Sequence, residues 1–134
     1  MSLPYDATYH PPAPVLSLRL AAPGEPPQVR PLSALVDTGS EGTLFPTHYL
    51  EQVEAIDVGD AILHGVLGEA REVHLYEVDL HIGALLLPSI IVVGDDQGSE
   101  VLLGRNVLNK LILLLDGRSG ETELFEKRPP FARP

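Results

Sequence analysis

The stretch Ser33-Ala34-Leu35-Val36-Asp37-Thr38-Gly39-Ser40 decides how this chain is interpreted. Small and apolar residues lead directly into a polar cluster, so the cluster stands at the end of a predicted strand. Strand ends that open into loops are where a rigid scaffold presents reactive side chains. The residues at 37–40 are also ordinary turn formers, and the tetrapeptide alone favours a structural turn. The surrounding sequence must therefore distinguish a turn from a reactive loop.

Strand patterns lie on both sides of this cluster. Upstream, 15–20 alternates apolar and polar residues, and a turn rich in Pro and Gly at 22–27 separates it from a second predicted strand, 28–36. Short helices are predicted at 47–54 and 105–110, the second with Asn106 as a candidate cap. Further apolar or alternating segments predict strands at 61–63, 72–82, 85–87, 90–93, 101–104, 111–115 and 121–125. The pattern predicts an all-β fold, closed as a barrel or packed as a sandwich.

Length and composition limit the function classes. The chain has 134 residues, which predicts a single domain, 1–134, with a core of about 14–126, an extended N-terminal arm 1–13 and an extended or disordered Pro-rich tail 127–134. The formal net charge is -10, with thirteen acids and one base in 37–100, and a solvated acidic face explains this excess most simply. Such charge argues against nucleic acid or an anionic membrane as a partner.

The N-terminal residues lack the basic and apolar regions of a signal peptide, and the longest nearly apolar run, 84–93, is too short to span a membrane. We therefore expect a cytoplasmic protein.

Several catalytic chemistries have no support in the sequence. The absence of cysteine excludes thiol nucleophiles, disulfides and thiolate metal sites. No two of the five histidines have a metal-binding helical spacing, and His64 is expected to be a solvated loop residue. Ser33 and Ser40 lack the Gly-x-Ser-x-Gly context of a nucleophile elbow, and no glycine motif for nucleotides precedes a helix. We expect no metal and no cofactor.

Two further features follow the Asp37 cluster in the chain. Gly65-Val66-Leu67-Gly68 places two apolar residues between glycines, at the tip of a predicted hairpin. Later, Leu102-Leu103-Gly104-Arg105-Asn106 joins a buried strand to a short helix. In this order and separation, the three features resemble the retropepsin-like aspartic protease family over Val15–Phe125. Two departures are Glu41, where viral members usually have Asp, and a flap tip with few glycines.

The resemblance implies a role for each motif residue. It makes Asp37 the catalytic carboxylate and lets Thr38 hydrogen-bond its two-fold mate. Gly39 leaves room for the substrate backbone, and Ser40 can support Asp37 through its hydroxyl. Arg105 would form a structural ion pair with Glu41, the acid that follows the loop. The flap residues expected to close over an extended peptide are Gly65, Val66, Leu67 and Gly68.

The chemistry agrees with these implied roles. Peptide hydrolysis without a metal, Ser or Cys needs one group to activate water and another to protonate or polarise the carbonyl. Two aspartates close together share one proton and do both. This chain has one such motif, so a second Asp37 must come from another subunit across a two-fold axis. The prediction is a homodimeric aspartic endopeptidase; the alternative is a catalytically silent retropepsin-like module for dimerisation or peptide binding.

Overall fold

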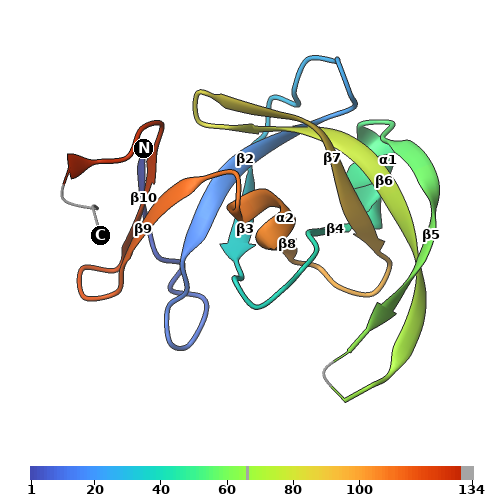
Figure 1. The fold of residues 1–134 in the computed structure, drawn as a ribbon, viewed down its shortest axis with the longest axis horizontal. Helices are drawn as coiled ribbons and strands as arrows, with labels where there is room; N and C mark the ends of the chain where they lie inside the picture. The colour runs from blue at the N-terminus through green and yellow to red at the C-terminus, as the bar shows by residue number, and fades with distance from the viewer. Residues whose placement is uncertain (66, 131–134) are drawn as a thin grey trace.

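The fold is a closed β-barrel with a small separate sheet beside it (Figure 1). The computed structural model describes residues 1–65 and 67–130. Its strands are β1 (Ser2–Pro4), β2 (Val15–Ala21), β3 (Leu32–Val36), β4 (Leu44–Pro46), β5 (Ile56–His64), β6 (Ala70–Ile82), β7 (Leu85–Asp95), β8 (Val101–Leu103), β9 (Ile112–Asp116) and β10 (Glu121–Phe125). Two short helices, α1 (Thr47–Gln52) and α2 (Arg105–Leu108), complete it. Neither helix in the described part of the chain is long and apolar enough to cross a membrane.

Closure of the barrel confirms the expected all-β class. The strand order is β2-β3-β8-β4-β7-β6-β5, and β2 also pairs with β6, so the first six strands form a ring while β5 extends beyond it. Strands β3 and β8 run parallel, as do β4 and β7. Buried hydrophobic side chains fill the interior, the largest being Phe45, Leu16, Leu18, Leu20, Leu50, Leu80, Ile82 and Leu103.

Several strand boundaries differ from the sequence prediction. The strand predicted at 28–36 begins only at Leu32, because Pro31 has no N–H to donate to a ladder. The predicted strand 61–63 is the end of the longer β5, whose outward-facing polar residues hide the pattern. The two segments 85–87 and 90–93 form one strand, β7, bent at Ser89, where φ is 55°. The buried Asp79 carboxylate accepts the N–H of Ser89 and that of Gly24, which fixes this bend.

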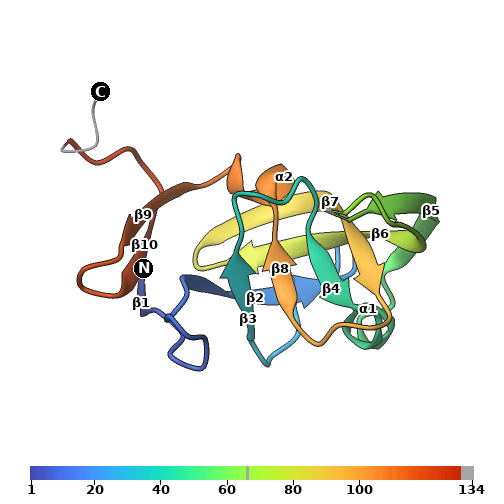
Figure 2. The ribbon, with the colours of Figure 1, turned by 90° about the horizontal axis from the view of Figure 1, so that it is seen from below.

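The two chain ends meet in the second sheet. Its order is β1-β10-β9, so the predicted N-terminal arm contributes a paired strand. The remainder of that arm forms a turn closed by a bridge between Asp6 and Ala13. Of the predicted tail, residues 131–134 lie outside the described residues. Figures 1 and 2 both show β9 leading away from the end of α2 to this terminal sheet, which stands to one side of the barrel.

Candidate active site

Asp37 lies immediately after β3, in a tight turn. Its N–H donates to the carbonyl of Leu103 on β8 (3.0 Å), and its own carbonyl accepts the N–H of Ser40 (3.2 Å). The N–H of Gly39 donates to Asp37 Oδ1 (3.0 Å). Asp37 is half-buried, whereas Thr38 and Gly39 are exposed. The turn therefore fixes the carboxylate by its own backbone and leaves the residues after it open to an incoming molecule.

The loop 37–43 crosses the end of β8 on its way from β3 to β4 (Figure 2). Because β8 is parallel to β3, both strands end at the same edge, and α2 begins there. The first N–H groups of α2 have no partner within the helix. They donate instead to the loop, Arg105 N–H to the Ser40 carbonyl (2.8 Å) and Asn106 N–H to the Glu41 carbonyl (3.2 Å). Helix and loop thus satisfy each other.

Thr43 connects the same parts through its side chain. It is fully buried, its hydroxyl accepts the N–H of Gly104 (3.0 Å), and it donates to Asn106 Oδ1 (2.8 Å). Asn106 Nδ2 in turn donates to the carbonyl of Ile91 on β7 (2.9 Å). The predicted role of Asn106 as helix cap is wrong, because Gly104 occupies that position without a side-chain bond. The sequence prediction missed Thr43; its signal was a lone hydroxyl within an apolar segment.

Gly104 is required by close packing. A Cβ there would lie 2.0 Å from the Gly42 carbonyl oxygen and 2.9 Å from that of Ser40. Both contacts are with backbone, so no side chain can rotate away to make room. The glycine of the Leu-Leu-Gly-Arg-Asn segment therefore lets α2 touch the loop that carries Asp37.

Two predicted partners differ in the structure. Arg105 Nη1 donates to the carbonyl of Thr38 (2.8 Å), and the ion pairs within the described residues are Arg71–Asp95 and His74–Asp60, so Arg105 does not pair with Glu41. Glu41 is exposed, and its carboxylate stays in water while its carbonyl binds α2. The Ser40 hydroxyl donates to the Gly42 carbonyl (2.8 Å) and not to Asp37. The side chains of Arg105 and Ser40 therefore bind backbone carbonyls of the loop and hold it in shape.

The predicted flap is the hairpin of β5 and β6. Its turn is closed by the N–H of Gly65 donating to the carbonyl of Glu69 (2.8 Å) and by Gly68, whose φ of 86° favours glycine. Leu67 is 93% exposed, so this apolar side chain stands in water at the tip. Val66, the other predicted apolar tip residue, lies outside the described residues. The hairpin thus presents an apolar side chain to water at its tip.

The base of this hairpin is attached to the barrel. The β6–β7 ladder ends at His74, paired with Gly94, and beyond it the described residues of the two arms pair with each other. One residue reaches back across this end: Arg71 Nη1 donates to Gln97 Oε1 (3.0 Å), and its Nη2 lies 3.5 Å from Asp95 Oδ1. Burial raises the pKa of the nearby Tyr76 above its usual range, and the charge of Asp57 raises it further, so the phenol stays neutral.

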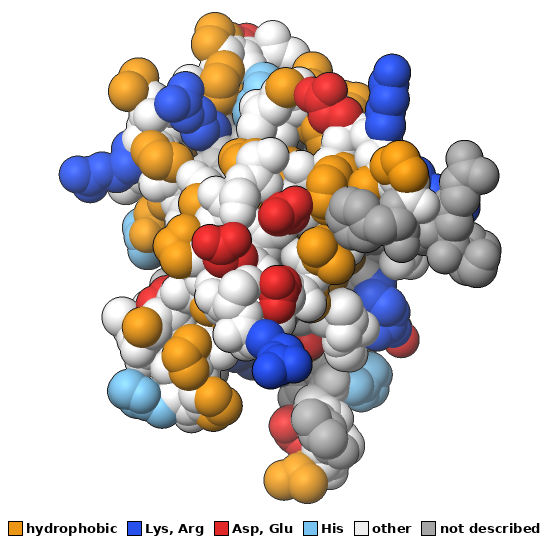
Figure 3. All heavy atoms as spheres, turned by 90° about the vertical axis from the view of Figure 1, so that its left-hand side faces the viewer, with side chains coloured by type: hydrophobic (Ala, Val, Ile, Leu, Met, Phe, Trp, Pro, Cys, Tyr) orange, Lys and Arg blue, Asp and Glu red, His pale blue; other side chains and the backbone are white. Residues whose placement is uncertain are grey.

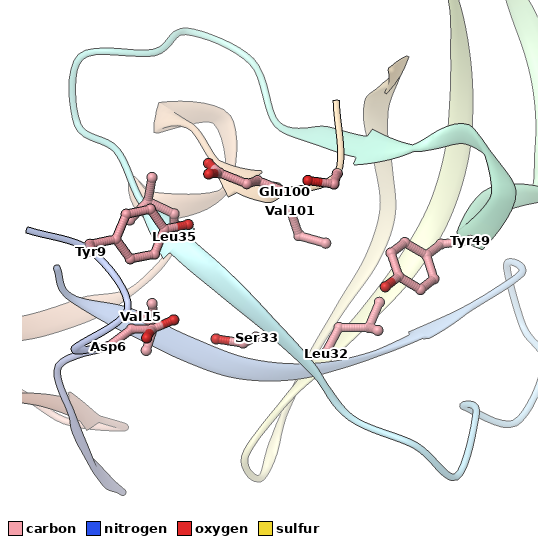
Figure 4. Close-up of a pocket in the computed structure, with 10 residues that line it drawn as sticks. Asp6, Tyr9, Val15, Leu32, Ser33, Leu35, Tyr49, Glu100 and Val101 are labelled. Carbon is pink, nitrogen blue, oxygen red and sulfur yellow. The ribbon is translucent and has the colours of Figure 1, made fainter. Parts of the chain in front are cut away.

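A shallow pocket of about 150 Å³ lies apart from Asp37 (Figure 4). It is lined by the N-terminal arm, by residues of β2 and β3, by Tyr49 of α1 and by residues 99–101, and Asp37 is not among them. Burial raises the pKa of Tyr9 there, and the adjacent Glu100 raises it further, so the phenol is uncharged. This pocket belongs to the packing of the arm on the barrel.

Similar folds occur among solved structures, although no family model and no curated protein matches the sequence. The EIAV protease in complex with the inhibitor HBY-793 matches with a TM-score of 0.56 and 19% identity, over 73% of this chain and 86% of that one. A retropepsin-like aspartic protease from Rickettsia conorii matches with a TM-score of 0.60 and 10% identity, over 91% of this chain and 86% of that one. The retroviral protease-like domain of Ddi1 from Leishmania major matches with a TM-score of 0.52 and 14% identity, over 85% of this chain and 90% of that one. At these identities the comparisons show the retropepsin-like fold.

Proposed function

We propose that this chain, which has the retropepsin-like fold, is an aspartic endopeptidase that works as a homodimer. The observation that carries the proposal is Asp37 at the end of β3, in an Asp-Thr-Gly-Ser turn whose backbone is bound to α2. A catalytic carboxylate needs this kind of support, because small misplacement of a reacting group slows a reaction strongly. The exposed Thr38 and Gly39 leave its neighbourhood open.

The proposed reaction uses the Asp37 carboxyls of two copies and one water. Two such groups a few ångströms apart hold one proton between them, because both cannot ionise comfortably. The ionised carboxylate takes a proton from the water, whose oxygen attacks the peptide carbonyl carbon. The protonated carboxyl gives its proton to the carbonyl oxygen. As the resulting diol collapses, one of its hydroxyls returns a proton to the second carboxylate and the C–N bond breaks. The amine leaves with the proton that the first carboxylate took from the water, so the pair again holds one proton.

The flap provides the substrate-binding side of the proposal. An extended peptide binds through main-chain hydrogen bonds, and its alternate side chains enter pockets. The apolar Leu67 at the hairpin tip gains by leaving water when such a peptide lies beneath it. We therefore propose that the substrates are extended segments with apolar side chains next to the bond that is cut.

A catalytically silent peptide-binding or dimerisation module is the second candidate. The likeness to the protease-like domain of Ddi1 leaves this second candidate open, because a likeness of fold at 14% identity carries no information on catalysis. The intact Asp37-Thr38-Gly39 argues for the enzyme, since a module has no need of this carboxylate.

One experiment separates the two candidates. The protein is incubated with a diverse peptide library between about pH 3.5 and 7.5, the range in which a carboxyl pair can hold a single proton. Cleavage that persists with a chelator and stops with a statine-type inhibitor supports the endopeptidase. Peptide binding without any product, at concentrations where the protein is dimeric, supports the module and contradicts the proposal.

A further inference from the structure

A hollow of about 390 Å³ lies on the outer face of strands β2 and β6, and none of residues 37–43 lines it. This outer hollow has a size within the range of cavities that hold small molecules. The described residues that line it include no acid, although the protein carries a formal net charge of -10. Its lining includes Met1, Ser17, Arg19, Pro27, Pro31 and His81.

The polar side chains of the outer hollow share one face of the barrel wall because side chains alternate along a strand. Leu18 and Leu20 are buried inside the barrel, so Arg19 between them points outward, and Ser17 follows the same alternation. Arg19 pairs directly with His81 of β6 in the antiparallel ladder. Residues that stand opposite each other in such a pair place their side chains together on one face. A hydroxyl, a guanidinium and an imidazole are therefore gathered at one place.

Neither basic group of the outer hollow has an acidic partner. Arg19 is exposed and takes part in neither of the ion pairs found in the described residues. Nε2 of His81 is buried and has no hydrogen-bond partner among them. Asp79, two residues earlier on β6, is already occupied, because its carboxylate accepts the N–H groups of Gly24 and Ser89. A buried polar atom without a partner costs free energy, which a bound ligand can recover.

Apolar groups form the walls of the outer hollow. Pro27 and Pro31 come from the loop between β2 and β3, and Met1 lies against Gly83, where a Cβ would be 3.5 Å from the Met1 sulfur. Figure 3 faces the side of the molecule on which the terminal sheet stands and shows basic, acidic and hydrophobic side chains interspersed over it. The outer hollow differs from such a mixed surface, because its charged groups are all basic and its walls are apolar. This combination fits a small molecule with an anionic head and an apolar body.

We propose that the outer hollow binds small organic oxyanions, either carboxylates or phosphate esters. The Arg19 guanidinium and the Ser17 hydroxyl donate to the oxygens of the anion, and a rotation of the His81 ring brings Nε2 to the same anion. The apolar part of the ligand lies against Pro27 and Met1. This inference is independent of the proposed function, since the Asp37 loop takes no part in the hollow.

Titration with three matched probes tests the proposal. Butyrate, butyl phosphate and butyramide carry the same kind of apolar chain and differ in the charge of the head. At constant ionic strength, the amide signals of Ser17, Arg19 and His81 in ¹H–¹⁵N NMR spectra of the full chain should shift saturably with the anions. The better of the two anions should bind with a Kd of about 1 mM, and butyramide at least about tenfold more weakly. A preference between the anions identifies the carboxylate or the phosphate as the favoured head.

A pair of arginine variants locates the binding. Arg19→Met keeps the aliphatic stem and removes the charge, so anion binding should weaken about tenfold. Arg118→Met makes the same change at an exposed arginine outside the hollow and should leave binding unchanged. Circular dichroism checks that both variants are folded.

Three results would overturn the proposal: equal affinity for butyrate, butyl phosphate and butyramide, an equal loss of anion binding in both arginine variants, or no saturable shift with either anion up to about 30 mM. The comparison of probes uses the wild-type chain, so it stays decisive if Arg19→Met does not fold. Peptide cleavage is not a readout here, and its absence would count against the proposed function alone.

Discussion

The Asp37 loop, residues 37–43, and the predicted flap, the outer part of the β5–β6 hairpin at residues 60–73, are held in opposite ways. The loop is bound from three directions: β8 accepts its first N–H, α2 donates to its carbonyls, and the buried Thr43 joins it to Asn106. Among the residues that the structure describes, the hairpin beyond His74 has the pairing of its own two arms and the contact from Arg71. Most of the β5 side chains are exposed, whereas Thr43 is fully buried.

Under the proposed function, this difference gives one small barrel both a fixed reactive group and a loosely attached cover. A group that activates water must be fixed before the substrate arrives, because ordering it later would cost free energy at the moment of reaction. A cover over an extended peptide must open and close, and segments with few buried contacts open most easily. The predictions below change one region or the other, beginning with the largest expected effect.

Replacement of the loop's carboxylate should remove activity without unfolding the barrel. In a dimer, Asp37→Asn changes both carboxyls, and amides can neither take a proton from water nor give one to the carbonyl. We expect a loss of about 10⁴-fold or more in kcat/KM against a cleaved peptide. Stability should stay the same or rise, because the repulsion between the carboxyls is removed. Circular dichroism melting and peptide cleavage, measured on the same preparation, check both expectations.

Mixing the variant with the wild type sharpens this result. A heterodimer has one carboxyl, so excess variant should remove activity in proportion to the wild-type dimers that it captures. Simple dilution of activity would contradict the shared pair, and cleavage by pure Asp37→Asn protein, free of contaminating protease, would exclude Asp37 as the catalytic group.

The closest contact between loop and helix gives the largest expected stability effect. Gly104→Ala places a methyl group 2.0 Å from the Gly42 carbonyl oxygen, so the loop and α2 must move apart. Overpacking against rigid backbone costs about 3 kcal/mol. Gly117→Ala is the matched control, because its Cβ has no neighbour within 4 Å, and it should change stability by less than about 0.5 kcal/mol. Equal urea midpoints for the two variants would show that the loop is looser than its contacts indicate.

The hydroxyl of Thr43 should matter far more than that of another buried threonine. Thr43→Val leaves the Gly104 N–H and the side-chain oxygen Oδ1 of Asn106 without their partner, which should lower the free energy of unfolding by about 2 kcal/mol. Thr122 in β10 is also fully buried, but its hydroxyl has no hydrogen-bond partner among the residues that the structure describes. Thr122→Val should therefore be neutral or stabilising. Urea unfolding of both variants measures the contrast, and a similar loss in both would mean that the Thr43 bonds contribute little.

The sequence was enough to predict the closed all-β fold and the position of Asp37 directly after a strand. Alternating strands and the Asp-Thr-Gly-Ser and Leu-Leu-Gly-Arg-Asn segments are local patterns, and the fold places the two segments in contact, as the resemblance implies. Strand limits were less predictable. Pro31 shortened β3, and Ser89 continued β7 only because the distant Asp79 accepts its N–H.

The partners of polar side chains could not be predicted from the sequence. Arg105 binds the Thr38 carbonyl instead of Glu41, and Ser40 binds the Gly42 carbonyl instead of Asp37, so both side chains satisfy backbone carbonyls of the turn. Thr43 has no neighbouring residue that reveals its role, since its partners are more than sixty residues away. Such bonds depend on how strands cross, which a local pattern does not encode.

The smallest expected effect concerns the attachment of the flap. Arg71→Met keeps the aliphatic stem but removes the bond to Gln97 and the contact with Asp95. Because the guanidinium is partly solvated, the loss of stability should be below about 1 kcal/mol. Freed beyond His74, the hairpin must be ordered again by each substrate, so KM should rise about threefold while kcat changes little. Hydrogen exchange should quicken in 60–73 and stay unchanged in 37–43, and the exposed Arg30→Met serves as control. Faster exchange in both regions would mean that the loop and the flap open together, and the contrast between a fixed site and a movable cover would not hold.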